Sequence, residues 1–317
     1  MSFAEELKAQ LEIPVIASPM FIISNPLLVA EQCKNGIVGS FPALNARPAE
    51  VLEQWLQQLT TELAEYKAAN PDKKVAPFAV NQIVHHSNDR LQHDLEACAK
   101  FQVPIMITSL RAPHEAVKVA HSYGGKVFHD VISVRHAEKA IEAGVDGLIL
   151  VCAGAGGHAG TLSPFALVSE IRKFYDGPIA LSGSITQGKQ ILAAEAMGAD
   201  FAYIGTRFIA THEANADEAY KQMIVDSAAT DVIYSNLFTG VHGNYLRGSI
   251  AKSGLDPDNL PEADKSAMSF GSDKSKAWRD IWGAGQGVGG IGEITSTAKV
   301  IAELKRDYLA AKQRLLG

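Results

Sequence analysis

The sequence predicts a parallel α/β fold, a TIM-type (β/α)8 barrel with a small helical insertion domain. Short apolar or β-branched runs alternate with longer helical patterns from residue 14 to about residue 211. Some of these runs, such as residues 148–151, are apolar throughout, which is typical of strands covered on both faces. The glycine-rich turns that look functional follow the last three runs, which favours a barrel over an open sheet.

Eight strands are expected from these runs. They span residues 14–17, 37–41, 75–81, 104–109, 126–131, 147–151, 178–182 and 201–204. Helical patterns between them cover residues 49–66, 89–101, 113–122, 134–143, 164–174 and 187–197, which is enough chain to connect parallel strands. An open doubly wound sheet is the alternative. Such sheets usually carry their glycine-rich turn after the first strand, where this chain has Ser18, Pro19 and Met20.

The strand–helix alternation ends after Thr211. Residues 213–280 read as helical or irregular, with a polar, turn-rich stretch at 253–264. Glycines return at 280–292, and residues 296–314 have the pattern of an amphipathic helix. We therefore expect residues 1–212 and 281–317 to form the barrel, and residues 213–280 to form a helical insertion that covers the active-site mouth.

Composition and charge exclude several classes of protein. The chain of 317 residues is 47% hydrophobic and 20% charged, as expected of a globular protein with a substantial core. Its formal net charge is −6 and no Lys/Arg cluster stands out, so nucleic acid is not an expected partner. No apolar run approaches the roughly 20 residues needed to span a bilayer. Residues 1–8 carry acids and do not read as a signal peptide, so no membrane partner is expected.

Three cysteines, Cys33, Cys98 and Cys152, form an odd and sparse set that favours a reducing cytoplasm over a disulfide framework. Cys33 and Cys98 fall on apolar faces of expected helices and read as core residues. Cys152 lies near the expected site, but no base is placed to activate it, so we interpret it as a bystander. No residues have the spacing and carboxylate support of a metal site, so no metal is expected.

The sixth expected strand runs into VCAGAGGHAG, residues 151–160, where four glycines surround one histidine. His158 therefore stands at the C-terminal end of a barrel strand, where the active sites of this fold are found. A histidine removes a proton or stabilises a developing anion near neutral pH. Gly156 and Gly157 allow the backbone to approach a flat ring closely. A cap on the next helix is the alternative role, and we favour the catalytic one.

Two further turns carry small and hydroxylated residues. The seventh strand ends in Ser182, Gly183 and Ser184, and the eighth ends before Gly205 and Thr206. Loops after strands seven and eight of a barrel commonly form a phosphate site from backbone N–H groups. Either loop alone could be an ordinary tight turn. Together, at matching places in the barrel, they predict a phosphate-binding site.

These motifs resemble the nitronate monooxygenase group of FMN-dependent barrels, over nearly the whole chain. Related members of that group include NADH:quinone reductases and flavin-dependent enoyl-acyl-carrier-protein reductases. AGGHAG at 155–160 matches the family's catalytic-histidine loop, and IGTRF at 204–208 matches its phosphate loop. PVIASPM at 14–20 is similar to the opening strand, whose backbone lies along the flavin. PFAVNQ at 77–82 is similar to the strand whose asparagine contacts the flavin, and AGQG at 284–287 to a segment that returns to it.

The resemblance implies FMN as the cofactor and His158 as the catalytic residue. The residues that it and the two loops nominate for FMN are Ala17, Ser18, Pro19, Met20, Asn81, Gly156, Gly157, Ser182, Gly183, Ser184, Gly205, Thr206 and Gln286. Asp130 is a further candidate. Relatives often have a lysine or glutamine there, so an aspartate would alter the electronic environment of the flavin.

Other histidines are weaker candidates. His85 and His86 follow Asn81 on the catalytic face and could line the substrate mouth. His93, His114, His121 and His136 fall on expected helices and read as solvated residues. In the insertion, His242, Tyr245 and Arg247 could reach the pocket, without identifying a substrate.

The resemblance favours FMN-dependent oxidation of alkyl nitronates (nitroalkanes), with molecular oxygen as the co-substrate. An NAD(P)H-dependent flavin reductase of quinones or another electron-poor acceptor is the alternative. A non-catalytic barrel that binds a phosphorylated ligand is a third reading, and the glycine–histidine loop gives it little support. The small-molecule substrate stays unidentified, and a homodimer is an open alternative.

Overall fold

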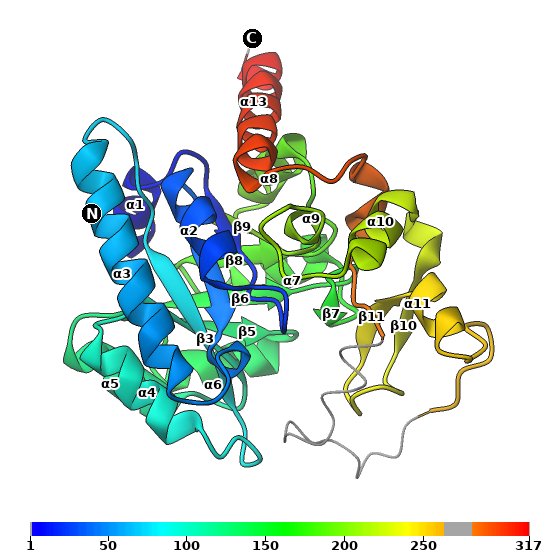
Figure 1. Cartoon of the computed structure of the whole chain (residues 1–317), viewed down its shortest axis with the longest axis horizontal. Helices are drawn as coiled ribbons and strands as arrows, with labels where there is room; N and C mark the ends of the chain where they lie inside the picture. Colours follow the sequence, from blue (N-terminus) through cyan, green and yellow to red (C-terminus); the bar gives the residue numbers. More distant parts are fainter. Residues whose placement is uncertain (1, 263–280, 317) are drawn as a thin grey trace.

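Eight parallel strands form the centre of the computed structural model, which describes residues 2–262 and 281–316 (Figure 1). Their order is β1-β9-β8-β6-β5-β4-β3-β2, and a parallel bridge between Ile16 and Val38 joins the first strand to the last. The strands are β1 (Val15–Ala17), β2 (Gly39–Pro42), β3 (Phe78–Val84), β4 (Ile105–Leu110), β5 (Lys126–Val131), β6 (Gly147–Val151), β8 (Ile179–Ser182) and β9 (Phe201–Ile204). This closure confirms the predicted (β/α)8 barrel.

Helices surround the barrel and connect its strands. They are α2 (Pro26–Lys34), α3 (Val51–Ala69), α4 (Leu91–Lys100), α5 (His114–Ser122), α6 (Val134–Glu142), α7 (Pro164–Ile171), α8 (Gly188–Ala196) and α13 (Thr297–Leu316). The helix α3 buries Leu52, Leu56, Leu59 and Leu63, whose spacing places them on one face toward the sheet. The final helix α13 packs against α8 and α2, and its C-terminal end projects from the barrel (Figure 1).

The predicted elements agree with these bounds to within a few residues, as expected because helix and strand ends are the least sharply defined positions. The helix α1 (Phe3–Ala9) was not predicted, and α2 was expected around Cys33 without bounds. In α2, Asn25 caps the N-terminus by accepting a hydrogen bond from the Leu28 amide at 2.9 Å, and Pro26 follows it. The start signal was therefore present in the sequence.

The barrel interior is closed at one end by α1. Leu7 of α1 is almost fully buried, and Phe3 packs on Phe128 with ring centroids 5.7 Å apart. Ile105, Phe128 and Phe201 belong to the same interior cluster. Because α1 covers the N-terminal ends of the strands, the C-terminal ends form the open mouth, where this fold places its sites.

Residues 213–262, the described part of the predicted insertion, include strands as well as helices. Here β10 (Val232–Ser235) and β11 (Gly243–Leu246) pair in antiparallel fashion, between α10 (Glu218–Asp226) and α11 (Arg247–Lys252). The insertion was expected to be helical or irregular, and these two strands were not predicted, since each is only four residues long and draws its stability from pairing. Residues 263–280 of the insertion lie outside the described residues.

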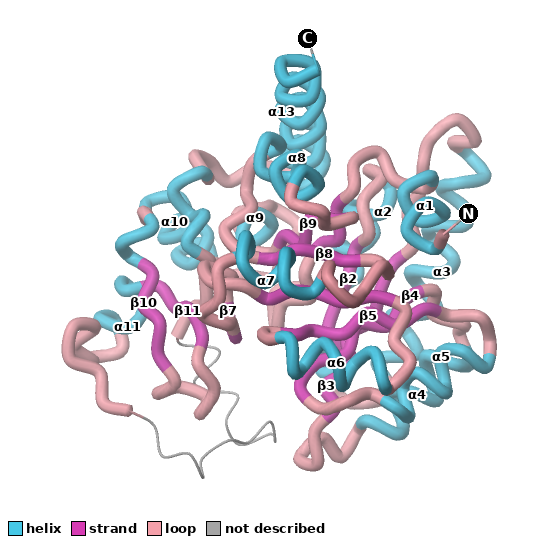
Figure 2. The backbone as a smooth tube through the Cα atoms, turned by 180° about the vertical axis from the view of Figure 1, so that it is seen from behind, coloured by secondary structure: helices cyan, strands magenta, loops and turns pink. Residues whose placement is uncertain are grey.

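A third strand joins this small sheet to the barrel. It is β7 (Gly157–His158), and its two residues pair with Asn244 and Gly243 of β11. Figure 2 shows β7, β10 and β11 side by side, next to the barrel. The insertion is therefore attached directly to the histidine loop. In the described ranges, no helix is both long and apolar enough to cross a membrane.

Candidate functional site

Inward-facing residues near the C-terminal ends of five barrel strands form a polar layer at the mouth. Below it the interior is apolar, with Ile107, Phe128 and Ile149 in one cluster. Because side chains alternate along a strand, the residues two positions further on point to the same face. We call the following set the upper polar layer: Asn81, Ser109, Asp130, Ser182 and Tyr203.

Three members of the upper polar layer form a hydrogen-bonded chain. The amide Nδ2 of Asn81 donates to Ser109 Oγ at 3.0 Å, and Ser109 Oγ donates to Asp130 Oδ2 at 2.7 Å. Burial raises the pKa of the Asp130 carboxyl from 3.8 to about 7, and the Ser109 hydrogen bond only partly offsets this effect. Asp130 therefore titrates near neutral pH at the floor of the mouth.

His158 lies at the edge of the mouth, in β7. Its Nε2 is 3.0 Å from the hydroxyl oxygen of Thr239, which belongs to the insertion. Burial lowers the pKa of His158 from 6.5 to about 4, so the imidazole is uncharged at neutral pH. The loop is held from the other side by Asn244, whose Nδ2 donates to the Ala155 carbonyl at 2.6 Å.

Glycines allow four chain segments to meet beside His158. Gly154 has a φ of 82°, and a Cβ there would lie 2.2 Å from Ser184 Oγ. A Cβ on Gly156 would lie 2.8 Å from the Gly285 amide nitrogen. Gly183 has a φ of 138°, a conformation that side chains disfavour. A side chain at Gly154 or Gly156 would collide with a neighbouring segment, so glycine allows the four segments to pack closely beside His158. We call Gly154, Gly156 and Gly183 the glycine cradle.

The segments are tied together by hydrogen bonds. Gly285 N donates to Thr206 Oγ1 at 2.9 Å, Gln286 N donates to the Gly154 carbonyl at 2.9 Å, and Thr186 Oγ1 donates to the Gly287 carbonyl at 3.2 Å. Around these contacts is a crevice lined by Gly154, Ala155, Gly156, Ser182, Gly183, Ser184, Ile185, Thr186, Tyr203, Gly205, Thr206, Gly285 and Gly287. Its enclosed part is only about 20 Å³, so the bulk of any ligand must lie over the barrel mouth.

The turn after β1 lies beside the same crevice. The Ser18 amide donates to the Ile204 carbonyl at 2.9 Å, and a Cβ on Gly205 would lie 3.2 Å from Ser18 Cβ and 3.6 Å from Met20 Sδ. The structure thus brings the segment 17–20 next to the loop at 205–206, and both border the upper polar layer.

Most residues nominated from the sequence meet at this end of the barrel, at the crevice, in the histidine loop, in the upper polar layer or in the turn after β1. Ser109, Tyr203, Thr239 and Asn244 are among the neighbours that were not nominated. Ser109 and Tyr203 could have been found by extending the strand alternation to its last inward position. Nothing in the sequence indicates that Thr239 reaches His158, because that contact depends on how the insertion folds back.

The other histidines have local partners. His86 Nδ1 lies 3.2 Å from Arg111 Nη2, and its ring is 4.0 Å from that of His85, in loops at the mouth. His121 pairs with Asp146 at 2.8 Å on the outside of the barrel. Among the described residues, no group of three His, Cys, Asp or Glu side chains could hold a metal ion.

The cysteines are buried and uncharged. Cys33 and Cys98 lie in helix cores, as predicted, and burial raises the pKa of each thiol to about 12. Cys152 sits at the base of the histidine loop, where burial also raises its pKa to about 12. A thiol with such a pKa is a poor nucleophile at neutral pH, which supports a bystander role for Cys152.

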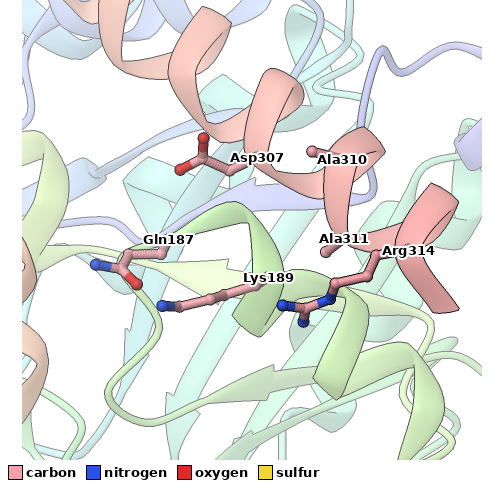
Figure 3. A pocket seen from close by; sticks show the side chains of 6 residues that line it. All are labelled: Gln187, Lys189, Asp307, Ala310, Ala311 and Arg314. Carbon is pink, nitrogen blue, oxygen red and sulfur yellow. The ribbon is translucent and has the colours of Figure 1, made fainter.

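A larger hollow of about 380 Å³ lies between α8 and α13 (Figure 3). Its lining comes from outer helices and includes Gln187, Lys189, Asp307 and Arg314. Figure 3 shows these side chains on the facing surfaces of the two helices. No strand end or glycine turn of the mouth contributes to this hollow, so we place the candidate site at the crevice despite its smaller volume.

Comparisons with known proteins identify the family of the chain. Residues 4–307 match the family model described as nitronate monooxygenase. A nitronate monooxygenase of Paraburkholderia phytofirmans is 25% identical over an alignment 356 positions long. The alignment covers 95% of this chain and 94% of that protein.

Solved structures share the fold. A nitroalkane oxidase from Streptomyces ansochromogenes has a TM-score of 0.81 at 21% identity, covering 98% of this chain and 99% of that one. FabK from Thermotoga maritima has a TM-score of 0.77 at 23% identity, covering 99% and 97%. Because the family match spans almost the whole chain, this protein belongs to the nitronate monooxygenase family of flavin-dependent oxidoreductases.

Proposed function

We propose that this protein binds FMN across the crevice and the barrel mouth and oxidises alkyl nitronates, with molecular oxygen as the second substrate. The observation that carries the proposal is the position of His158, a half-buried and uncharged imidazole beside the glycine cradle at the mouth. When bound, FMN supplies a two-electron acceptor whose reduced form reacts with oxygen.

The residues around the crevice fit such a ligand. Gly183, Ser184, Gly205 and Thr206 would hold the phosphate, with small side chains and hydroxyl groups. The ring system would lie over the upper polar layer. It would be held by the segment 17–20, Gly156, Gly157, Asn81, Asp130, Ser182 and Gln286. The pairing of β11 with the histidine loop supports the view that residues 213–262, the described part of the insertion, cover the mouth.

His158 would bind the nitronate oxygens. An imidazole whose pKa has fallen to about 4 is a weak base, so it is poorly suited to removing a proton from a neutral nitroalkane. It can still donate a hydrogen bond to a substrate that is already anionic. The negative charge of that substrate would raise the pKa of His158 and strengthen the contact. Nitronates should therefore be better substrates than neutral nitroalkanes.

A second candidate is an NAD(P)H-dependent flavin reductase of quinones or another electron-poor acceptor. It is favoured by the exposed pair of His86 and Arg111 at the mouth, whose positive charge suits a phosphate group of a nicotinamide nucleotide. The pair could equally attract an anionic nitronate, so it does not decide between the two candidates.

Anaerobic mixing separates the candidates. The protein loaded with FMN is mixed with a nitronate, with NADH or with NADPH, and flavin absorbance is followed in time. We expect the nitronate to bleach the flavin within the turnover time and the nicotinamides to do so at least about a hundredfold more slowly. Rapid bleaching by a nicotinamide, with none by the nitronate, would show that the reductase is correct.

A further inference from the structure

One buried carboxyl group in the upper polar layer has no neutralising partner. Asp130 ends the inward row of β5, and its Oδ1 is buried without a hydrogen-bond partner among the described residues. Among the described residues no charged neighbour contributes to the pKa shift of Asp130, whose causes are burial and the Ser109 hydrogen bond. A buried ionised carboxylate without a cation is unfavourable, so the neutral acid is the form that this environment stabilises.

The hydrogen bonds determine where its proton sits. Asn81 Nδ2 donates to Ser109 Oγ, and the single hydroxyl proton of Ser109 is donated to Asp130 Oδ2. Oδ2 is therefore already an acceptor. The proton of the neutral acid belongs on Oδ1, and there it forms a donor that no described protein atom accepts.

The groups that face Asp130 carry no charge at neutral pH. Tyr203 approaches it from β9. Burial, and then the charge of Asp130, raise the pKa of Tyr203 well above its ordinary range. On β4 and β3 the facing groups are the uncharged Ser109 and Asn81. His129 precedes Asp130 on β5 but contacts Thr108 on the opposite face, and burial lowers its pKa to about 4.

Asp130 is also next to the ligand crevice. Tyr203, which interacts electrostatically with Asp130, lines that crevice together with Ser182. A ligand that lies over the mouth therefore covers the layer containing Asp130. The ring system of a flavin offers carbonyl oxygens and ring nitrogens, which are hydrogen-bond acceptors.

We propose that Asp130 keeps its proton on Oδ1 and donates it in a hydrogen bond to the ring system of bound FMN. This inference rests on the proposed FMN site. No covalent bond changes, and the proton stays on Asp130. Above the carboxyl's titration midpoint, the ionised form would repel the same acceptors, so binding FMN would require uptake of one proton.

The test is the pH dependence of FMN affinity in the wild type and in Asp130→Asn, measured calorimetrically in two buffers of different ionisation heat. Asparagine keeps a donor at this position but cannot ionise. The FMN phosphate titrates in both proteins, so its contribution cancels in the ratio of the two dissociation constants. We expect the wild-type to variant ratio to be near one at low pH and to grow up to about tenfold per pH unit above the midpoint.

A second variant tests the direction in which the pH midpoint of FMN affinity moves. Ser109→Ala removes the donor that favours the charged carboxylate, so the midpoint should move to higher pH. A ratio that is constant with pH, or a midpoint that moves down in Ser109→Ala, overturns the inference while leaving the FMN site intact. A wild-type protein that binds no FMN at any pH contradicts the proposed function itself.

If Asp130→Asn does not fold, infrared spectroscopy of the wild-type protein decides. The band of a protonated carboxyl group that disappears as pH rises through about 7 supports the inference. A spectrum in which every carboxyl group has ionised below about pH 5 overturns it.

Discussion

Among single residues, the glycines of the site matter as much as its polar side chains. The neighbouring glycines allow the His158 loop to pack closely against the loops at 183–184 and 285–287. The same burial that prepares the site lowers the pKa of His158 to about 4 and raises that of Asp130 to about 7. Both groups are thereby shifted toward their uncharged forms.

The glycine cradle can be tested at one position. Gly156→Ala places a Cβ about 2.8 Å from the Gly285 amide nitrogen and 3.0 Å from Thr206 Oγ1, so the crevice must widen or shift. We expect FMN affinity to fall about tenfold or more, since overpacking typically costs 1–3 kcal/mol. Titration of FMN measures it.

Gly292→Ala is the matched control, because a Cβ there meets nothing within 4 Å and the residue is exposed. Its affinity for FMN should equal that of the wild type. Equal affinities for all three proteins would mean that the crevice does not hold the ligand.

At the scale of elements, the barrel was predictable and the insertion was not. Continuous apolar runs such as residues 147–151 and strong helical spacing such as that of Leu52–Leu63 depend on local sequence, and they identified all eight barrel strands. The two-residue strand β7 and the four-residue strands β10 and β11 are stabilised by one another. No local pattern carries that information, so the contact of Thr239 with His158 could not be foreseen.

This contact gives an element-scale prediction. Thr239→Val keeps the shape of the side chain but removes the hydroxyl that holds His158 Nε2 at 3.0 Å. We expect turnover of the nitronate to fall about 10- to 100-fold through loss of orientation, with FMN affinity unchanged. Steady-state kinetics and FMN titration measure the two effects separately.

The control is Thr211→Val. Thr211 is equally buried, and its hydroxyl donates to the Phe208 carbonyl at 2.8 Å, away from His158. It should lose stability without losing turnover. If both variants lose turnover to the same extent, the effect of Thr239→Val is on folding and the insertion does not position the histidine.

In the whole molecule, one end of the barrel is filled by apolar packing and the other end holds the candidate site. The helix α1 and the aromatic residues Phe128 and Phe201 fill the closed end. The open end buries a carboxyl group and an imidazole whose charged forms are both disfavoured. Stability of the protein without FMN should therefore depend on pH in a way that reports on the open end.

The stability contributions of Asp130 and His158 change in opposite directions as pH rises. The Asp130 pKa is raised from 3.8 to about 7, so its contribution is fully present below about pH 4 and is lost as pH rises to about 7. The His158 pKa is lowered from 6.5 to about 4, so its contribution is present above 6.5 and is lost as pH falls to about 4.

Comparing the wild type with Asp130→Asn isolates the first contribution, since His158 is common to both proteins. Urea unfolding at a series of pH values should show the wild type losing up to on the order of 4 kcal/mol relative to the variant between about pH 4 and pH 7, and no more above that. A difference that is the same at every pH would show that folding does not shift the pKa of Asp130.

FMN binding at the crevice beside His158 is tested most directly by the flavin content of the purified protein after incubation with FMN and removal of the excess. We expect a yellow protein with about one FMN per chain, and a large loss of FMN in Gly156→Ala but not in Gly292→Ala. A colourless protein that takes up no FMN would contradict the assignment of the crevice beside His158 as a flavin site.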